Sequence, residues 1–190
     1  MDIDIDFCDR TVALSQFKHI IASRHQDSGL TSHNTGIYVQ NIPHNPVSNL
    51  STIDFKSAEK RGYFKIDFLN VGVYNGVRDN DHLITLMETE PLWELLEDNE
   101  FVNLLFHLNG HGDILKMTLP TSVEQLAAVL AMIRPSKRYL IGKDWETIMK
   151  EVWIKPELGD NSYFWKKAHA FSYAIVVIVQ MNLICEQENQ

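Results

Sequence analysis

The sequence predicts an α+β fold in which a small mixed sheet carries acidic residues and is backed by several helices. Two segments, residues 2–7 and 63–69, alternate polar and apolar side chains with the period of two that is typical of strands. Longer segments repeat apolar residues at helical spacing, so we expect more helices than strands. These longer segments cover residues 91–108, 121–135, 144–153 and 163–185. With 190 residues and 45% hydrophobic content, the chain is long enough to form one compact domain over residues 1–190.

The first part of the chain is expected to alternate strands with short helices. After the first strand, Asp9 or Thr11 can cap a helix that continues to about Ile21. Residues 26–36 are rich in turn-forming residues, which predicts an ordered loop before a strand at 37–42.

Two later helices have recognisable ends. Asp54 or Ser57 can start a short helix that Gly62 stops. Thr121 and Glu124 have the spacing of a capping box at the start of the helix in 121–135. One predicted helix therefore ends at Gly62 and the other begins at about Thr121.

Charge limits the nucleic-acid surfaces that this chain can offer. Its 17 Lys and Arg residues against 25 Asp and Glu residues give a net charge of -8, which disfavours tight nonspecific binding of DNA by the whole surface. A local basic groove remains open, although the basic residues of the C-terminal half also fit an ordinary solvated face. These residues are Lys137, Arg138, Lys143, Lys166 and Lys167.

The sequence predicts a cytoplasmic location, which would be the host cytoplasm if a virus encodes the chain. Cys8 and Cys185 form no CxxC motif, so neither a disulfide framework nor a thiolate zinc site is expected. No secretory signal pattern opens the chain. Residues 174–184 are too short to cross a bilayer and include Gln180 and Asn182, so we expect a buried helix and no membrane partner.

The two alternating strands place acidic side chains on one face each. Asp4 and Asp6 share a face of the first strand, and Lys65 and Asp67 share a face of the second. If the strands pair, three aspartates meet, and such a cluster can hold two divalent cations for phosphoryl transfer. Mg²⁺ suits carboxylate oxygens, with Mn²⁺ as an alternative. The same pattern also fits a plain edge strand whose charges prevent aggregation.

Several segments resemble a known family when they are read in chain order. "DIDIDF" and the later "GYFKIDFLN" look like the two acidic palm strands of the family C DNA polymerases, the alpha subunit of bacterial DNA polymerase III. "TSHNTGIYV" and "IDFKSAEKRG" resemble segments that lie between those strands in the family. "NLLFHLNGHG", "AAVLAMIRPSK" and "KKAHAFSYAIV" resemble later segments. The matches cover nearly the whole chain in the family's order.

The resemblance implies a nucleotidyltransferase palm that synthesises DNA with Mg²⁺ from a primer-template and dNTPs. Asp4, Asp6 and Asp67 match the family's three metal-binding catalytic aspartates. Lys65 matches a lysine two residues before the third aspartate, where a cation can contact a phosphate.

Four further residues are substrate-binding or DNA-binding candidates by the same resemblance. Lys167, His169 and Tyr173 match the family's K-S-H-x-x-x-Y positions, and His33 matches the histidine of the H-x-x-G loop. His169 and Tyr173 are also i and i+4 neighbours on a helix, so ordinary helix packing is the competing explanation. For His33 the alternative is a turn stabilised by polar side chains.

The departures from the family keep other functions open. Asn70 replaces a glycine, and no counterpart of the Gly-Ser element that cradles the incoming triphosphate is found. One alternative is therefore a non-catalytic palm, or one part of a split polymerase, that acts as an assembly partner in a replisome with a separately encoded piece. Another is a metal-dependent nuclease, because carboxylate clusters serve several phosphoryl-transfer reactions.

A histidine pair offers a second candidate metal site. His107 and His111 have the i, i+4 spacing of zinc ligands on a helix. Gly110 and Gly112 interrupt this segment and favour a loop or turn instead.

Overall fold

The computed structural model of the chain describes residues 3–27, 29–156 and 164–188. Its contacts divide the chain into two compact units, Met1–Asn75 and Gly76–Gln190, and each is described by itself. The sequence predicted one compact domain over residues 1–190. The difference arises because the buried apolar residues of each half cluster among themselves, so that each unit has its own core.

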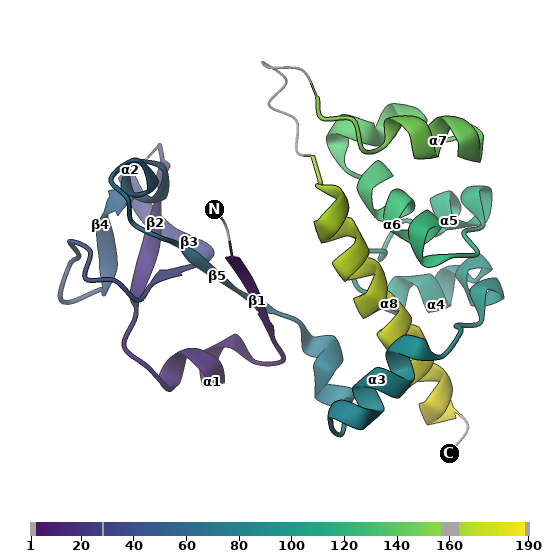
Figure 1. Cartoon of the computed structure of the whole chain (residues 1–190), viewed down its shortest axis with the longest axis horizontal. Coiled ribbons are helices and arrows are strands. Elements are labelled where there is room, and N and C mark those ends of the chain that lie inside the picture. Colours follow the sequence, from purple (N-terminus) through teal and green to yellow (C-terminus); the bar gives the residue numbers. More distant parts are fainter. Residues whose placement is uncertain (1–2, 28, 157–163, 189–190) are drawn as a thin grey trace. The chain divides into compact units, whose positions relative to one another are not determined.

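The first unit is built on a mixed five-stranded sheet with the order β1-β5-β3-β2-β4. Neighbouring strands β1 and β5 are parallel, as are β2 and β4, whereas β3 is antiparallel to both of its neighbours. This mixed sheet, with the helices of the chain, confirms the predicted α+β class (Figure 1). The elements are β1 (Ile3–Phe7), α1 (Arg10–Ser15), β2 (Ile20–Gln26), β3 (Gly29–Tyr38), β4 (Leu50–Asp54), α2 (Phe55–Lys60), β5 (Ile66–Asn70) and the 3-10 turn η1 (Gly72–Gly76).

The predicted pairing of the two acidic strands is confirmed. Asp4 lies opposite Asp67 in the parallel register of β1 and β5, and Asp6 lies opposite Leu69. Figure 1 shows the two strands running side by side. On the other face, Ile5 and Phe68 pack with α1, so burial of the apolar residues fixes which face the aspartates occupy.

The segment between residues 16 and 36 differs from the prediction. Helix α1 ends at Ser15, and residues 20–26 form strand β2 in place of the last turns of a helix. Most of the expected loop at 26–36 is instead strand: residues 29–36 belong to β3, which pairs antiparallel with β2 and begins at Gly29 with φ 119°. Apolar residues spaced three or four apart also fit alternation in a strand, and glycine accepts the positive φ that the tight turn requires.

The short helix α2 begins and ends where the sequence indicated. The Asp54 Oδ1 atom accepts hydrogen bonds from the backbone N–H groups of Lys56 and Ser57 at 3.1 and 3.2 Å. Gly62 follows the helix at φ 82°, a conformation that favours glycine. This helix carries Phe55, which contacts the candidate site described below.

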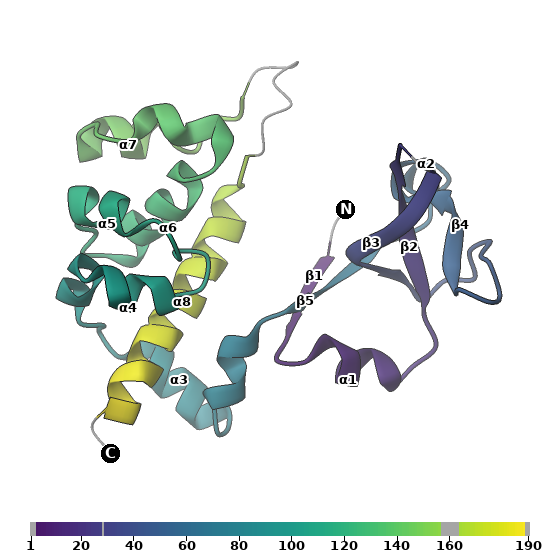
Figure 2. The ribbon, with the colours of Figure 1, turned by 180° about the vertical axis from the view of Figure 1, so that it is seen from behind.

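The second unit consists of helices around the long helix α8. Helix α8 packs on α6 and α3, and these helices are seen beside it in Figure 2. The elements are α3 (Asn80–Glu88), the 3-10 turn η2 (Trp93–Glu97), α4 (Asn99–Leu104), α5 (Gly112–Thr118), α6 (Val123–Met132), the 3-10 turn η3 (Pro135–Leu140), α7 (Trp145–Glu151) and α8 (Lys167–Glu188). Residues 163–166, where α8 was expected to begin, precede it or fall outside the described residues.

Two helix starts in the second unit differ from the expected ones. The helical pattern of 91–108 is broken at Asp98, which accepts the N–H of Glu100 at 2.9 Å and caps α4. Helix α6 is capped by Ser122 rather than Thr121, because Ser122 Oγ accepts the N–H of Gln125 at 3.2 Å. The N-cap is therefore one residue later than predicted, and Gln125 Oε1 accepts the Thr121 N–H at 2.8 Å in place of the reciprocal bond of a capping box.

The prediction of a buried helix over residues 174–184 is confirmed. Helix α8 is long and apolar enough to cross a membrane by length and composition, and half of its apolar window is buried in the structure. Gln180 Nε2 donates to the Leu104 carbonyl at 2.7 Å, and Asn182 Nδ2 donates to the Leu86 and Thr89 carbonyls at 2.9 Å each. The polar side chains of α8 thus satisfy carbonyl groups at the ends of α4 and α3.

Candidate active site

The candidate site lies on the acidic face of β1 and β5 in the first unit. Asp4 and Asp67 occupy in-register positions of neighbouring parallel strands, which run about 4.8 Å apart. Asp6 follows on the same face of β1. Asp4 and Asp6 are exposed, whereas Asp67 is only 8% exposed. The sheet therefore brings the three predicted aspartates onto one face, with Asp67 at its protected end.

Both carboxylate oxygens of Asp67 have partners. Thr35 Oγ1 donates a hydrogen bond to Asp67 Oδ1 at 2.7 Å. The Lys65 ammonium forms an ion pair with Asp67 Oδ2, and both side chains are nearly buried. Lys65 also lies near the Phe55 ring, with Nζ 5.9 Å from the ring centroid. These contacts fix the orientation of the Asp67 carboxylate.

His33 positions the irregular part of β3 that carries Thr35. Its Nδ1 atom accepts hydrogen bonds from the N–H groups of Gly36 at 2.9 Å and Thr35 at 3.3 Å. Burial lowers the pKa of His33, and the positive charge of Lys65 lowers it further. Because Nδ1 accepts these bonds, its 3.7 Å separation from Asp67 Oδ1 is a contact between neighbours and not an ion pair. His33 therefore has a supporting role: it holds the backbone at Thr35 and Gly36 beside Asp67.

Position 36 has no room for a side chain, so only glycine fits there without movement of its neighbours. A Cβ atom at this position would lie 2.7 Å from Lys65 Cδ, 3.0 Å from His33 Nδ1 and 3.1 Å from Ala22 Cβ. Gly36 also lies opposite Asp67 in the register of β3 and β5. The histidine and glycine of the predicted loop thus pack directly against the Lys65–Asp67 pair.

The donor set suits a hard divalent cation, although a lysine is the cation in place here. Asp4, Asp6 and Asp67 offer carboxylate oxygens, the ligands that Mg²⁺ prefers. Over residues 3–27, 29–156 and 164–188, no three His, Cys, Asp or Glu side chains lie in a group that could hold a metal ion. The Lys65 ammonium occupies the position on Asp67 that a cation would take. The three aspartates are of the type that Mg²⁺ prefers and share one face, and Asp67 is paired with Lys65 in this arrangement.

A polar cavity lies where β1 and β5 end, on the side of the two strands that Phe68 and α1 occupy. It has a volume of about 530 Å³ and lies against Arg10, Thr35 and Asn70. Arg10 donates through its backbone N–H to Asn70 Oδ1 at 2.9 Å and through Nη2 to the Thr35 carbonyl at 3.3 Å. Thr35 thus contacts both the cavity and Asp67. The sequence analysis missed Arg10 and Thr35; the nearest signal was the position of Arg10 directly after the first acidic strand.

Three of the predicted site residues belong to the second unit, and two of them contact aromatic side chains there. The Tyr173 ring stacks on Trp165 at 4.9 Å between centroids and meets the edge of His107 at 4.7 Å. Lys167 Nζ lies 5.4 Å from the Phe171 ring centroid. His169, half-buried, is on the first turn of α8. For Tyr173 the contacts fit ordinary packing, the alternative weighed against substrate contact.

The predicted basic face includes one buried lysine. Lys137 is 3% exposed, and its Nζ donates to the Glu151 carbonyl at 2.8 Å. Burial lowers the pKa of Lys137. Lys137 is therefore tied to the end of α7 and does not belong to a solvated basic surface.

The histidine pair lies in a turn, as expected, and not on one helix. His107 adopts φ 62°, a conformation that breaks a helix, and His111 precedes α5 as its N-cap. Burial lowers the pKa of His107 to about 4, with a further contribution from Arg134. His107 therefore stays neutral in the folded protein under conditions in which it is protonated in the unfolded chain.

This shift predicts a stability change with pH in the second unit. The folded pKa is below the ordinary value of 6.5, so stability falls as pH drops from about 6.5 toward about 4. After discounting for partial solvent screening, we expect a loss of about 1 kcal/mol between pH 7 and pH 5. Urea unfolding at both pH values measures it.

The control for this pH effect is His107→Asn, because asparagine tolerates a positive φ but does not titrate. The variant should lose about 1 kcal/mol of the pH dependence relative to the parent protein. An unchanged difference between pH 7 and pH 5 would show that other groups cause it.

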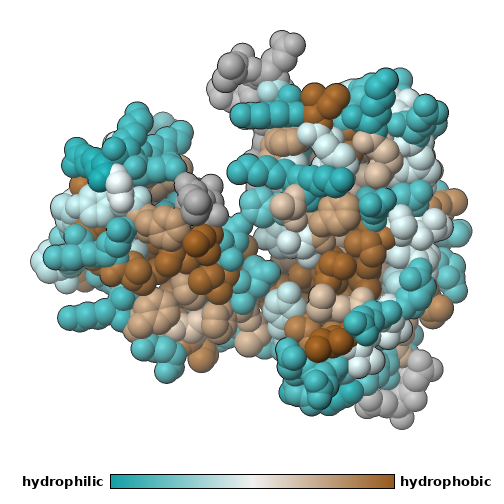
Figure 3. All heavy atoms as spheres, viewed as in Figure 1, coloured by the Kyte–Doolittle hydropathy of each residue, from teal (hydrophilic) through white to brown (hydrophobic). Residues whose placement is uncertain are grey.

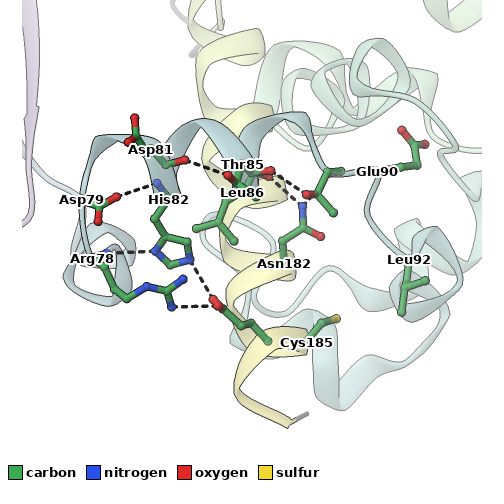
Figure 4. Close-up of a pocket in the computed structure, with 12 residues that line it drawn as sticks. Arg78, Asp79, Asp81, His82, Thr85, Leu86, Glu90, Leu92, Asn182 and Cys185 are labelled. Atoms are coloured by element: carbon green, nitrogen blue, oxygen red, sulfur yellow. Dashed lines mark hydrogen bonds and ion pairs between the residues drawn. The ribbon is translucent and has the colours of Figure 1, made fainter. Parts of the chain in front are cut away.

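A second cavity, of about 630 Å³, lies between α3 and the end of α8 (Figure 4). Arg78 Nη1 and His82 Nε2 each hydrogen-bond a Glu186 carboxylate oxygen at 2.9 Å, and these bonds lower the pKa of Glu186. His82 Nδ1 accepts the backbone N–H of Arg78 at 3.1 Å, so Nε2 carries the proton that Glu186 accepts. This network joins the start of α3 to α8 and has a structural role.

Comparison of the chain with protein-family models, with curated proteins and with solved structures finds no match.

Proposed function

We propose that the first unit is the catalytic palm of a nucleotidyltransferase that resembles the family C DNA polymerases and carries out Mg²⁺-dependent DNA synthesis. The observation that supports this most directly is the in-register pairing of Asp4 with Asp67 on parallel strands. The aspartates selected by their alternation in the sequence are the same three that match the family's catalytic positions.

In this proposal Asp4, Asp6 and Asp67 hold two Mg²⁺ ions. When bound, such ions stabilise the charge on the attacking and leaving oxygens of phosphoryl transfer. The reaction joins the primer 3'-oxygen to the α-phosphorus of a dNTP, breaks the bond to the β-phosphate bridging oxygen and releases pyrophosphate. The hydroxyl proton passes to solvent or to a neighbouring carboxylate.

The remaining residues of the site orient the Asp67 carboxylate and neutralise its charge. Thr35 holds one oxygen of Asp67, so the carboxylate keeps its orientation before substrate arrives. Lys65 neutralises Asp67 in the absence of other cations, and it becomes available to a substrate phosphate when a cation replaces it. His33 accepts the Gly36 N–H and so holds this part of β3 in place beside Asp67.

The ion pair between Lys65 and Asp67 also favours a second candidate function. A palm whose third carboxylate is permanently held by lysine would bind no metal and would serve as an assembly partner for a separately encoded polymerase part or another replication protein. The two functions differ in whether Mg²⁺ replaces Lys65 at the Asp67 carboxylate.

Primer extension with the purified full chain, a labelled primer-template, dNTPs and Mg²⁺ tests the proposal. We expect a lengthened primer, and a loss of about 100-fold for Asp6→Asn, which removes an exposed carboxylate without changing shape. A shortened primer would indicate a nuclease. No change of length with any replication partner added would favour the assembly role.

A further inference from the structure

The cavity of about 630 Å³ in the second unit is a groove between α3 and the end of α8 (Figure 4). Its floor is buried and includes Leu86 of α3 and Asn182 of α8. Its rim is exposed and includes Thr85, Thr89 and Leu92. A groove between two helices, with an exposed rim, has the form into which a third helix can pack.

The polar side chains on the floor of the groove already have partners. Asn182 donates both N–H groups of its amide to backbone carbonyls at the end of α3. His82 hydrogen-bonds a backbone N–H through Nδ1 and the Glu186 carboxylate through Nε2. A small polar ligand needs polar groups that converge on it, and those of this floor are engaged within the protein. The groove is therefore better suited to apolar side chains, which Leu86 and Leu92 can contact.

Negative charge surrounds this groove. Asp81 and Glu90 are exposed carboxylates of its lining. Arg78, the one basic residue of the lining among the described side chains, is paired with Glu186. The groove also belongs to an acidic part of the chain, because residues 79–115 include nine acidic residues and no lysine or arginine. A partner that covers the groove must therefore bring positive charge, since like charges would repel it.

We propose that this groove docks a basic amphipathic helix of a partner protein. Apolar side chains of that helix would contact Leu86 and Leu92, and its lysine or arginine side chains would pair with Asp81 and Glu90. Helices that bind in grooves place apolar residues at i, i+3, i+4 and i+7, and complementary charges around them fix the orientation. Every residue of the groove belongs to the second unit, so the inference does not depend on the catalytic function proposed for the first.

A second copy of this chain fits the groove less well than a basic partner does. The net charge of -8 makes two copies repel each other. The three longest described helices, α3, α6 and α8, contain one lysine or arginine between them, Lys167. None of the three therefore presents the basic amphipathic face that the groove requires, and we expect the docked helix to come from another protein.

Binding of a synthetic helical peptide to the full chain, measured by fluorescence anisotropy, tests the groove. The peptide has leucine at i, i+3, i+4 and i+7 and lysine at the remaining exposed positions. The control peptide has the same composition in scrambled order, so it carries the same charge without an apolar face. We expect the helical peptide to bind at least about tenfold more tightly than the scrambled peptide.

Leu92→Ser should weaken binding of the helical peptide by about tenfold, because it removes an apolar contact at the rim of the groove. Leu104→Ser is the matched control. It makes the same change at a residue that is 60% exposed, against 52% for Leu92, and that lies outside the lining of the groove. The control should change the affinity by less than about twofold.

The charges of the rim have a separate test. Asp81→Asn combined with Glu90→Gln should weaken binding about fivefold and should reduce its dependence on salt. Glu124→Gln combined with Glu146→Gln is the matched control, because it makes the same charge change at exposed positions in the first turns of α6 and α7. The control should leave the affinity within about twofold of the parent protein.

These outcomes decide the inference whether or not the chain extends primers. Binding of the helical peptide that depends on Leu92 and on the two rim carboxylates would support the groove. Equal losses in the groove variants and their controls would overturn it, because they would show general attraction to an acidic protein. Equal binding of the two peptides, or no binding of either, would overturn it as well. Self-association in sedimentation equilibrium that Leu92→Ser abolishes would assign the groove to a second copy and overturn the basic partner.

Discussion

Asp67→Asn should reduce primer extension by about 1,000-fold and should also destabilise the first unit. Removal of one group that stabilises transition-state charge costs about 100-fold to 1,000-fold, and Asp67 occupies the protected, in-register position of the site. The same change leaves the nearly buried Lys65 ammonium without its carboxylate, a loss that costs about 3 kcal/mol in comparable pairs. The rate of primer extension and the free energy of unfolding measure the two effects.

A double variant separates chemistry from folding. Lys65→Met together with Asp67→Asn removes both charges, so most of the lost stability should return. Primer extension should not return, because the carboxylate is still absent. If the double variant regained both stability and activity, Asp67 would be a structural residue and the proposed site would be wrong.

The pairing of β1 with β5 could be predicted because two independent patterns agree. Both strands alternate with period two: Ile3, Ile5 and Phe7 share one face of the first strand, and Ile66 and Phe68 share one face of the second. A shift of one residue would expose Ile5 and Phe68 and bury the aspartates, so only registers that keep the aspartates on one face are favourable. The structure has the register in which Asp4 lies opposite Asp67.

The β2–β3 hairpin could not be predicted by the same means. Ile20 and Ile21 continue the apolar spacing of α1, so helical periodicity extends past the residue where the helix ends. The turn-forming residues around Gly29 predict a loop, whereas Gly29, at φ 119°, is the first residue of β3. Pairing with β3, a long-range contact, decides the conformation of this segment.

Thr35 shows why part of the site escaped sequence analysis. The register of β2 and β3 shifts between Ile21 and Ser23, so residues of β3 near Thr35 depart from simple alternation. Its hydroxyl reaches Asp67, 32 residues away in sequence, because of that local irregularity. The alternation of side chains between two faces holds only where strand pairing is regular. It does not predict which way a side chain points at a bulge.

Exposed apolar residues of the first unit were also outside the prediction. Ile3, Phe7, Val12 and Phe17 are each at least 38% exposed and belong to β1, α1 and the segment that follows α1. Figure 3 shows brown side chains gathered over this part of the unit. The sequence predicts which face of β1 is apolar, but how much of that face remains exposed depends on how short α1 is.

Leu130→Ala should destabilise the second unit by about 3 kcal/mol. Leu130 is fully buried on α6, in the cluster that includes Ala174 and Val177 of α8. Truncation removes buried methyl groups and leaves a cavity that close-packed helices fill only in part, which typically costs about 2 to 5 kcal/mol. The free energy of urea unfolding, followed by helical circular dichroism, measures the change.

Leu104→Ala is the matched control for this core prediction. Leu104 is 60% exposed at the end of α4, and its contact with Gln180 uses the backbone carbonyl, which the substitution keeps. We expect a change of less than about 0.5 kcal/mol. Equal losses in the two variants would mean that α6 does not pack on α8 as described, because a buried and an exposed leucine would then contribute alike. A large loss for Leu130→Ala alone would establish the α6–α8 contact as the main support of the second unit.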